Sequence, residues 1–174
     1  MCCIHTKCYL CRKFLNVCNS FSSFHTNQVF RHRDLINCKS DCIIYRIDCT
    51  THRVSYIGYT ITDMKTRFSN NKSHFKKKNA SCELINHLLS NNHDDIDFSS
   101  IKNYDDSLSK HIRVTLIEKV KVEPNDSRSV KESKCEAREG FWQTQLRTLQ
   151  PYGGLNKRDN RKYVSERSQK HSLT

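Results

Sequence analysis

The chain has 174 residues and a formal net charge of +12 at pH 7, because 30 lysines and arginines outnumber 18 acidic residues. Apolar residues make up 36%, and the 4 glycines and 2 prolines are too few for a collagen-like sequence or a flexible linker. Since no stretch approaches the roughly 20 apolar residues of a membrane helix, we expect a basic intracellular domain that contacts a polyanion and no membrane.

The first quarter of the chain is rich in cysteine and lacks a steady apolar period. Seven of the ten cysteines lie within the first 42 residues. Clustered cysteines without a signal sequence are typical of a reducing compartment, where they bind metal or pack as small buried side chains. Disulfides are the less favoured alternative. We expect residues 1–41 to form a Cys-rich extension that is partly disordered or stabilised by zinc.

A β-hairpin is predicted where the periodic part of the chain begins. Residues 42–48 and 53–57 are two runs rich in β-branched and aromatic side chains, with a short polar turn between them. Gly58 ends the second run. After it, Asp63 can cap a helix over residues 64–78, whose apolar side chains recur on one face.

Two more helices and one more strand follow in the second half of the chain. The pattern predicts a short apolar helix over residues 83–90 and an alternating strand over residues 111–118. The longest helix is expected over about residues 129–149, with Phe141 and Trp142 on its buried side.

The order of these elements predicts the fold class. Two strands, two helices, a strand and a helix are typical of an α+β fold, here a small three-stranded antiparallel sheet flanked by helices. We place this domain at residues 42–159, after the Cys-rich extension. Residues 160–174 are expected to form a basic disordered tail.

Five residues in these elements form a pattern that suggests chemistry. They are two tyrosines on the paired strands, an arginine in the next helix, a glutamate in the last helix and an asparagine beyond it: Tyr45, Tyr56, Arg67, Glu139 and Asn156. With their neighbours in the sequences IIY, YIG, REGFWQ and PYGGLN, they resemble the GIY-YIG nuclease family. The resemblance covers about residues 38–159. It is most specific to the endonuclease domain of Penelope-like retroelements.

The resemblance implies a metal-dependent DNA endonuclease that nicks DNA to prime insertion. Arg67 would hold a phosphate with its fork of donors, and Glu139 would bind Mg²⁺ or Mn²⁺. Tyr45 or Tyr56 would assist the attacking water, and Asn156 would order the site. Because all must reach one phosphate, we expect the tyrosines, the arginine and the glutamate on one concave face. Placement on opposite faces of the sheet would argue against a nuclease.

Two positions depart from the family pattern. Ile43 replaces the first glycine, and Asn71, one helical turn after Arg67, stands where the family has a histidine or another proton-transfer side chain. His74, two turns after Arg67, is the substitute base. The alternative function is therefore a catalytically impaired, zinc-stabilised nucleic-acid-binding module, or a decayed relic of such a nuclease.

Cysteine and histidine spacing predicts a structural zinc site. Cys49 and His52 have two residues between them in the hairpin turn, and His87 and His93 have five between them at the end of the short helix. Tetrahedral zinc takes such ligands at such spacings. The resemblance implies a similar Cys-Cys-His-His set, in which His52 here replaces the second cysteine.

A second cysteine pair has the same two-residue spacing. Cys8 and Cys11 could bind metal together with Cys38 and Cys42, or with His25. Because the further ligands lie far away in the sequence, spacing alone does not choose among them.

The charge distribution favours DNA as the partner. Four lysines follow Arg67 along the predicted helix and would attract phosphates next to the site: Lys72, Lys76, Lys77 and Lys78. Phosphate contacts carry no sequence information, so no target sequence follows from them. A reverse transcriptase domain encoded elsewhere is a further expected partner, and the expected location is the nucleus.

Overall fold

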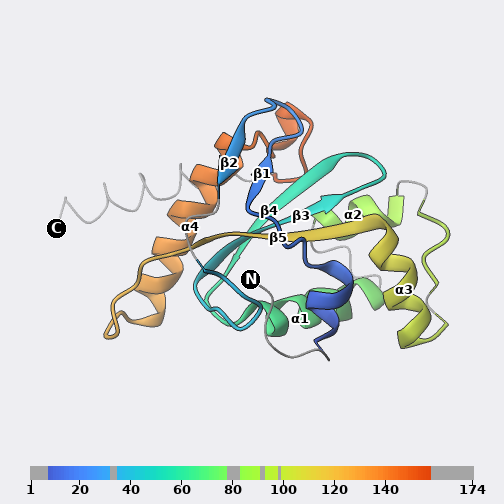
Figure 1. Ribbon diagram of the computed structural model, residues 1–174, viewed down its shortest axis with the longest axis horizontal. Helices are drawn as coiled ribbons and strands as arrows, with labels where there is room; N and C mark the ends of the chain where they lie inside the picture. Colours follow the sequence, from blue (N-terminus) through green and yellow to red (C-terminus); the bar gives the residue numbers. More distant parts are fainter. Residues whose placement is uncertain (1–7, 32–34, 78–82, 91–92, 98, 158–174) are drawn as a thin grey trace.

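The centre of the protein is a three-stranded antiparallel sheet in the order β4-β3-β5 (Figure 1). The computed structural model describes residues 8–31, 35–77, 83–90, 93–97 and 99–157. The strands are β3 (Ile43–Cys49), β4 (Val54–Thr60) and β5 (Ile112–Lys119). The predicted hairpin and the predicted α+β class are confirmed.

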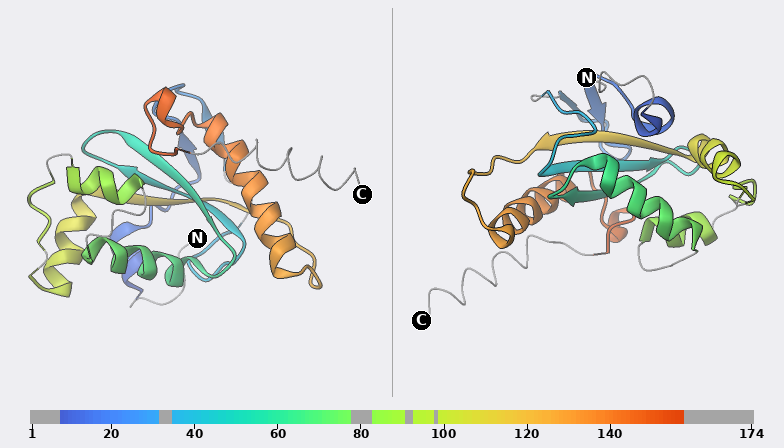
Figure 2. Two further views of the ribbon diagram at one scale, coloured as in Figure 1. Left: turned by 180° about the vertical axis from the view of Figure 1, so that it is seen from behind. Right: turned by 90° about the horizontal axis from the view of Figure 1, so that it is seen from below.

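Different elements cover the two faces of this sheet (Figure 2). One face carries α1 (Met64–Lys76), α2 (Glu83–Ser90), α3 (Ile101–His111) and the single turn η1 (Leu10–Phe14). The other carries α4 (Arg128–Gln145) and the short hairpin of β1 (Ser20–Ser22) and β2 (Val29–Arg31). We call these the α1 face and the α4 face. Alternate residues of β3 enter the two cores, with Tyr45 on the α1 face and Ile44 on the α4 face.

The central strand β3 buries two charged side chains on the α4 face. Arg46 Nη2 lies 2.8 Å from Asp48 Oδ2, and Ser55 Oγ donates a hydrogen bond of 2.5 Å to Asp48 Oδ1. Arg46 Nη1 also donates to the carbonyl oxygen of Ser22 in β1 at 2.6 Å. Because each buried charge has a partner, the pair is tolerated and joins β1 to the sheet.

The helices begin where side chains can cap them. Asp63 Oδ1 accepts a hydrogen bond of 2.9 Å from the Thr66 amide at the start of α1, as predicted. The last helix begins at Arg128 and ends at Gln145, four residues before the predicted end. Phe141 is 37% exposed, so its predicted burial is wrong. Its ring instead lies under the Arg138 guanidinium, 4.3 Å from the ring centroid.

Four elements were not predicted: η1, the β1–β2 hairpin, α3 and the short 3-10 helix η2 (Gln150–Tyr152). Leu10 and Phe14 of η1 are buried in the α1-face core, and Phe21 of β1 is buried in the α4-face core. The described part of the Cys-rich extension is thus an integral part of the fold. Its remaining residues, 1–7 and 32–34, and the predicted tail lie outside the described residues. Within the described ranges, no helix combines the length and apolarity needed to cross a membrane.

Candidate active site and metal centre

Two tyrosine rings meet over a glycine on the α1 face. Tyr45 in β3 pairs with Gly58 in the edge strand β4. A β-carbon built on Gly58 would lie 2.6 Å from Tyr45 Oη and 2.9 Å from Cε1 of Tyr56. Any other residue at position 58 would therefore displace one of these rings. The glycine of the YIG sequence makes room for the two predicted catalytic tyrosines.

Arg67 reaches the same place from α1. Because the helix begins at Met64, Arg67 lies in its first turn, and its Nε donates a hydrogen bond of 3.2 Å to Tyr45 Oη. Tyr45 has no exposed surface, whereas Tyr56 and Arg67 are half-buried. The structure thus brings three of the five predicted catalytic residues together.

Asn156 holds the outer edge of β4. Its Oδ1 accepts a hydrogen bond of 2.9 Å from the Ile57 amide, and its Nδ2 donates one of 2.8 Å to the Ile57 carbonyl. A tight turn delivers it: Gly153 has φ = +85°, and a β-carbon on Gly154 would lie 2.1 Å from the Thr148 carbonyl. Both polar groups of the Asn156 amide are occupied by β4, which suits a positioning role.

Glu139 lies on the helix α4 and is 5% exposed. Cys135 of this helix and Leu146, the residue just after it, pack in the α4-face core. Burial, followed by the charges of Glu136 and Glu139, raises the pKa of the Tyr59 hydroxyl in β4. The helix that carries Glu139 thus packs on the α4 face. The convergence of its carboxylate with Arg67 and the two tyrosines on one concave face stays a prediction.

The positions that depart from the family pattern differ in exposure. Ile43 is fully buried in the α1-face core. On α1, Asn71 is half-buried and His74 is exposed. His74 is therefore accessible to solvent, while the amide of Asn71 has no basic lone pair to accept a proton at neutral pH.

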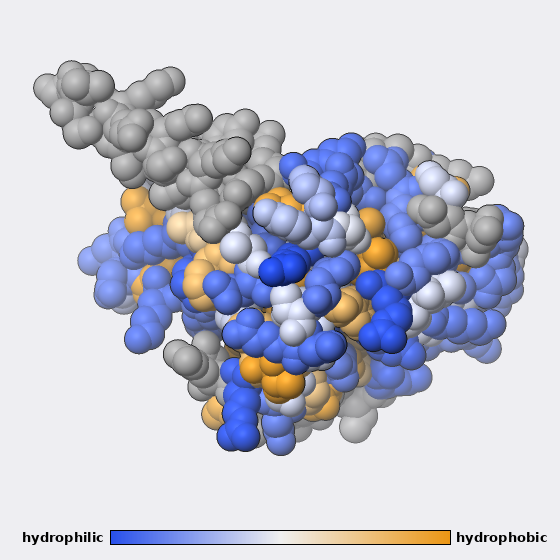
Figure 3. Space-filling view, turned by 90° about the horizontal axis from the view of Figure 1, so that it is seen from above, coloured by the Kyte–Doolittle hydropathy of each residue, from blue (hydrophilic) through white to orange (hydrophobic). Residues whose placement is uncertain are grey.

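The predicted lysine stripe is only partly available for phosphate. Lys72 Nζ lies 2.8 Å from Asp105 Oδ1 in α3 and 4.4 Å from the centroid of the Tyr9 ring. Its charge thus has an acidic partner inside the fold, while its contact with phosphate stays a prediction. Lys76 and Lys77 are exposed at the end of α1, and Lys78 lies outside the described residues. On the face of the molecule seen in Figure 3, hydrophilic residues predominate and small apolar patches lie between them.

The predicted Cys/His set comes together at the hairpin turn. Cys49 Sγ lies 3.5 Å from His52 Nδ1 and 3.4 Å from His93 Nε2. With His87, the four ligand atoms all lie within 4.8 Å of one another. Sulfur and nitrogen ligands of one tetrahedral zinc are about 3.5 Å apart. These residues could hold a metal ion, which would join the turn to α2.

Burial favours the neutral form, which metal binding needs, in two of the three histidines. Burial, followed by the neighbouring His93 and His52, lowers the pKa of His87 to about 4. Burial and the neighbouring imidazoles also lower the pKa of His93. Both rings are therefore neutral at pH 7 and can coordinate a cation without first losing a proton.

His111 supports this group and was not predicted to do so. Its ring centroid lies 4.9 Å from that of His93, and its Nε2 lies 2.7 Å from Asp95 Oδ1. Its neighbour Ile112 pairs with Cys49 in the sheet, which brings His111 beside the turn. Only the strand register reveals this, because His111 and the predicted ligands share no local spacing.

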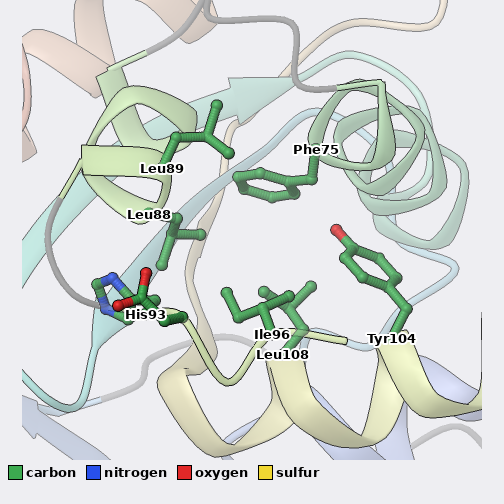
Figure 4. A pocket seen from close by; sticks show the side chains of 8 residues that line it. Phe75, Leu88, Leu89, His93, Ile96, Tyr104 and Leu108 are labelled. Atoms are coloured by element: carbon green, nitrogen blue, oxygen red, sulfur yellow. The ribbon is translucent and has the colours of Figure 1, made fainter. Parts of the chain in front are cut away.

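A cavity lined mainly by apolar side chains, together with His93 and Asp94, adjoins the metal group. It has a volume of about 270 Å³ and lies between α1, α2 and α3 (Figure 4). Phe75, Leu88 and Tyr104 line it, with His93 at one side. Phe75 in the last turn of α1 and His93 of the Cys/His group thus line the same cavity.

The geometry offers two kinds of chemistry: an arginine-held tyrosine hydroxyl at a sheet edge, and a four-ligand metal group at the hairpin turn. Comparisons of the chain with protein-family models, with curated proteins and with solved structures found no match. The functional argument therefore depends on these residues alone.

Proposed function

We propose that the chain is a metal-dependent DNA endonuclease module that hydrolyses phosphodiester bonds, similar to the GIY-YIG domains of Penelope-like retroelements. The observation that carries the proposal is the 3.2 Å contact between Arg67 Nε and Tyr45 Oη, beside the Tyr56 ring and above Gly58. The permanent positive charge of the guanidinium can stabilise a phosphoryl group. The neighbouring phenol hydroxyls can transfer a proton.

Each residue has a role in this proposal. Arg67 binds a phosphate oxygen, and the half-buried Tyr56 orients the attacking water. Asn156 keeps β4 in place beneath them. Glu139 fits a Mg²⁺ ion because magnesium binds through one or two carboxylates and keeps most of its waters. Such an ion would neutralise charge on the phosphate and acidify a bound water.

We assign zinc to the group formed by Cys49, His52, His87 and His93. Cysteine with histidine at tetrahedral separations is the donor set that zinc prefers. In this proposal the zinc is structural, and it holds the turn of the hairpin that carries both tyrosines. In this proposal the substrate is genomic DNA, and the protein acts in the nucleus. A reverse transcriptase domain encoded elsewhere would prime synthesis at the nick.

A second candidate function is a zinc-stabilised DNA-binding module without catalysis. Asn71 favours it, because an amide cannot replace a catalytic base. Both candidates use the same basic surface, so DNA binding alone does not separate them.

Nicking of supercoiled plasmid with Mg²⁺ separates the two candidates. A nuclease should lose at least about 100-fold in rate in Arg67→Ala and in Glu139→Gln. Glu132→Gln is the matched control on α4, since Glu132 pairs only with the exposed Arg128 side chain in the described contacts. A wild type that binds DNA with steep salt dependence but never cuts supports the second candidate. Absence of both binding and cutting contradicts both.

A further inference from the structure

Three cysteines outside the sites above meet on the α1 face. Cys8 precedes the turn η1, Cys11 lies within it, and Cys38 lies in the loop before β3. The Sγ atoms of Cys8 and Cys38 are 3.7 Å apart, and the three sulfurs all lie within 4.8 Å of one another. Side chains 30 residues apart thus converge on one point.

The separation of the sulfurs matches a shared metal ion. Two thiolates bound to one tetrahedral zinc at about 2.3 Å each are about 3.8 Å apart. Cys8 is 6% and Cys38 is 1% exposed, and Cys11 is half-buried between this group and solvent. The site is therefore shielded on two sides and reachable on the third.

The local backbone explains why these three cysteines meet. The Arg12 amide donates a hydrogen bond of 3.1 Å to the Cys8 carbonyl, which closes the turn that carries Cys8 and Cys11. The Lys65 amide donates one of 3.0 Å to the Cys38 carbonyl, which fixes Cys38 at the start of α1. The cysteines come from two segments that the fold already holds side by side.

The structure also decides among the ligands that spacing left open. Cys42 belongs to the α4-face core with Cys135, so the sheet separates it from Cys8. His25 lies beside Gly153, and Gly153 belongs to the turn that leads to Asn156. Neither belongs to the cysteine group, which leaves three sulfur ligands among the described residues.

We propose that Cys8, Cys11 and Cys38 bind a second zinc ion through three thiolates, with water or another donor at the fourth position. The ion holds the N-terminal segment against α1. The same packing is supported by Tyr9, whose hydroxyl lies 2.8 Å from Ser69 Oγ in α1. Zinc here would thus stabilise the first turn of α1, which carries Arg67.

Zinc content of the purified full-length chain tests the site. Two zinc ions per chain are expected in the wild type, and one in Cys38→Ser and in Cys49→Ser. Cys18→Ser is the matched control, because Cys18 is outside both groups, and it should keep two. A wild-type content of one that Cys38→Ser removes supports this site and contradicts the Cys/His site. Unchanged zinc content in Cys38→Ser overturns the proposal.

Cobalt substitution distinguishes the two sites even if a variant folds poorly. If the Cys8, Cys11 and Cys38 site binds cobalt, the sulfur-to-cobalt charge-transfer band should be weaker in Cys11→Ser than in the wild type, because this variant lacks one of the three thiolates. The half-buried Cys11 is the mildest of the three substitutions. Charge transfer that depends on Cys49 alone overturns the proposal. A thiol titration of the unreduced, unfolded chain also overturns it if the wild type shows only as many free thiols as Cys8→Ser/Cys38→Ser. The two cysteines would then form a disulfide.

Discussion

Different interactions hold the two ends of the β3–β4 hairpin. At the turn, Cys49 and His52 meet His87 and His93 through polar ligand atoms at metal-binding separations. Towards the open end, Tyr45 is held by excluded volume above Gly58 and by one hydrogen bond from Arg67. The turn therefore carries a group of side chains that could hold a cation, whereas the tyrosine site depends on packing.

This difference predicts separable responses. Neutral imidazoles buried beside a thiol lose water contacts, and a metal ion compensates for that loss. Aromatic packing needs no ion, but it tolerates very little added volume. Metal removal should loosen the turn first, and added volume should disturb the tyrosines first.

The largest expected effect is at the turn. His93→Ala, or a chelator, should lower the free energy of unfolding by several kcal/mol, on the order of what one structural zinc ligand set contributes. Thermal unfolding with and without added Zn²⁺ measures this. His74→Ala, exposed on α1, is the control. His111→Ala is not a control, because its ring packs against His93, and a smaller loss is expected there. A melting temperature indifferent to zinc in the wild type would contradict the metal site.

The next effect tests the packing of the tyrosines. Gly58→Ala should destabilise the protein by about 1–3 kcal/mol, because the new methyl group overlaps the Tyr45 ring. Propensity alone predicts the opposite sign, since glycine inside a strand is normally unfavourable by about 0.5–1 kcal/mol. Urea unfolding decides between the signs. In a Tyr45→Ala background the cost should shrink, because the overlapping atoms are gone. Stabilisation by Gly58→Ala would refute the described packing.

The smallest effect concerns α1, which runs between the two regions. Lys77→Ala should weaken DNA binding and lower the slope of log affinity against log salt by about 1, because an exposed lysine releases counterions. Lys72→Ala should leave that slope unchanged, since Asp105 already neutralises Lys72. Filter binding or fluorescence anisotropy across a salt series measures both. Equal slopes for the two variants would show that the lysines are equivalent after all.

Local sequence was sufficient for the elements with strong patterns. The hairpin, the Asp63 cap of α1 and the pairing of Cys49 with His52 follow from strand propensity, capping chemistry and ligand spacing within a few residues. The unpredicted α3 has its two buried anchors, Tyr104 and Leu108, in a segment that is otherwise mostly polar, so its low apolar content hid the helix.

The amino-acid sequence thus specifies the chemical groups and their local spacing. Their arrangement in space follows from the packing of the fold: the helix of Glu139 packs on the α4 face, His111 lies beside His93, and Lys72 pairs with Asp105. The fold also chose Cys38 over Cys42 as the partner of Cys8. The reason is that strand register and helix placement depend on the burial of the whole core, and residues 30 or more apart have no local signal of their contact.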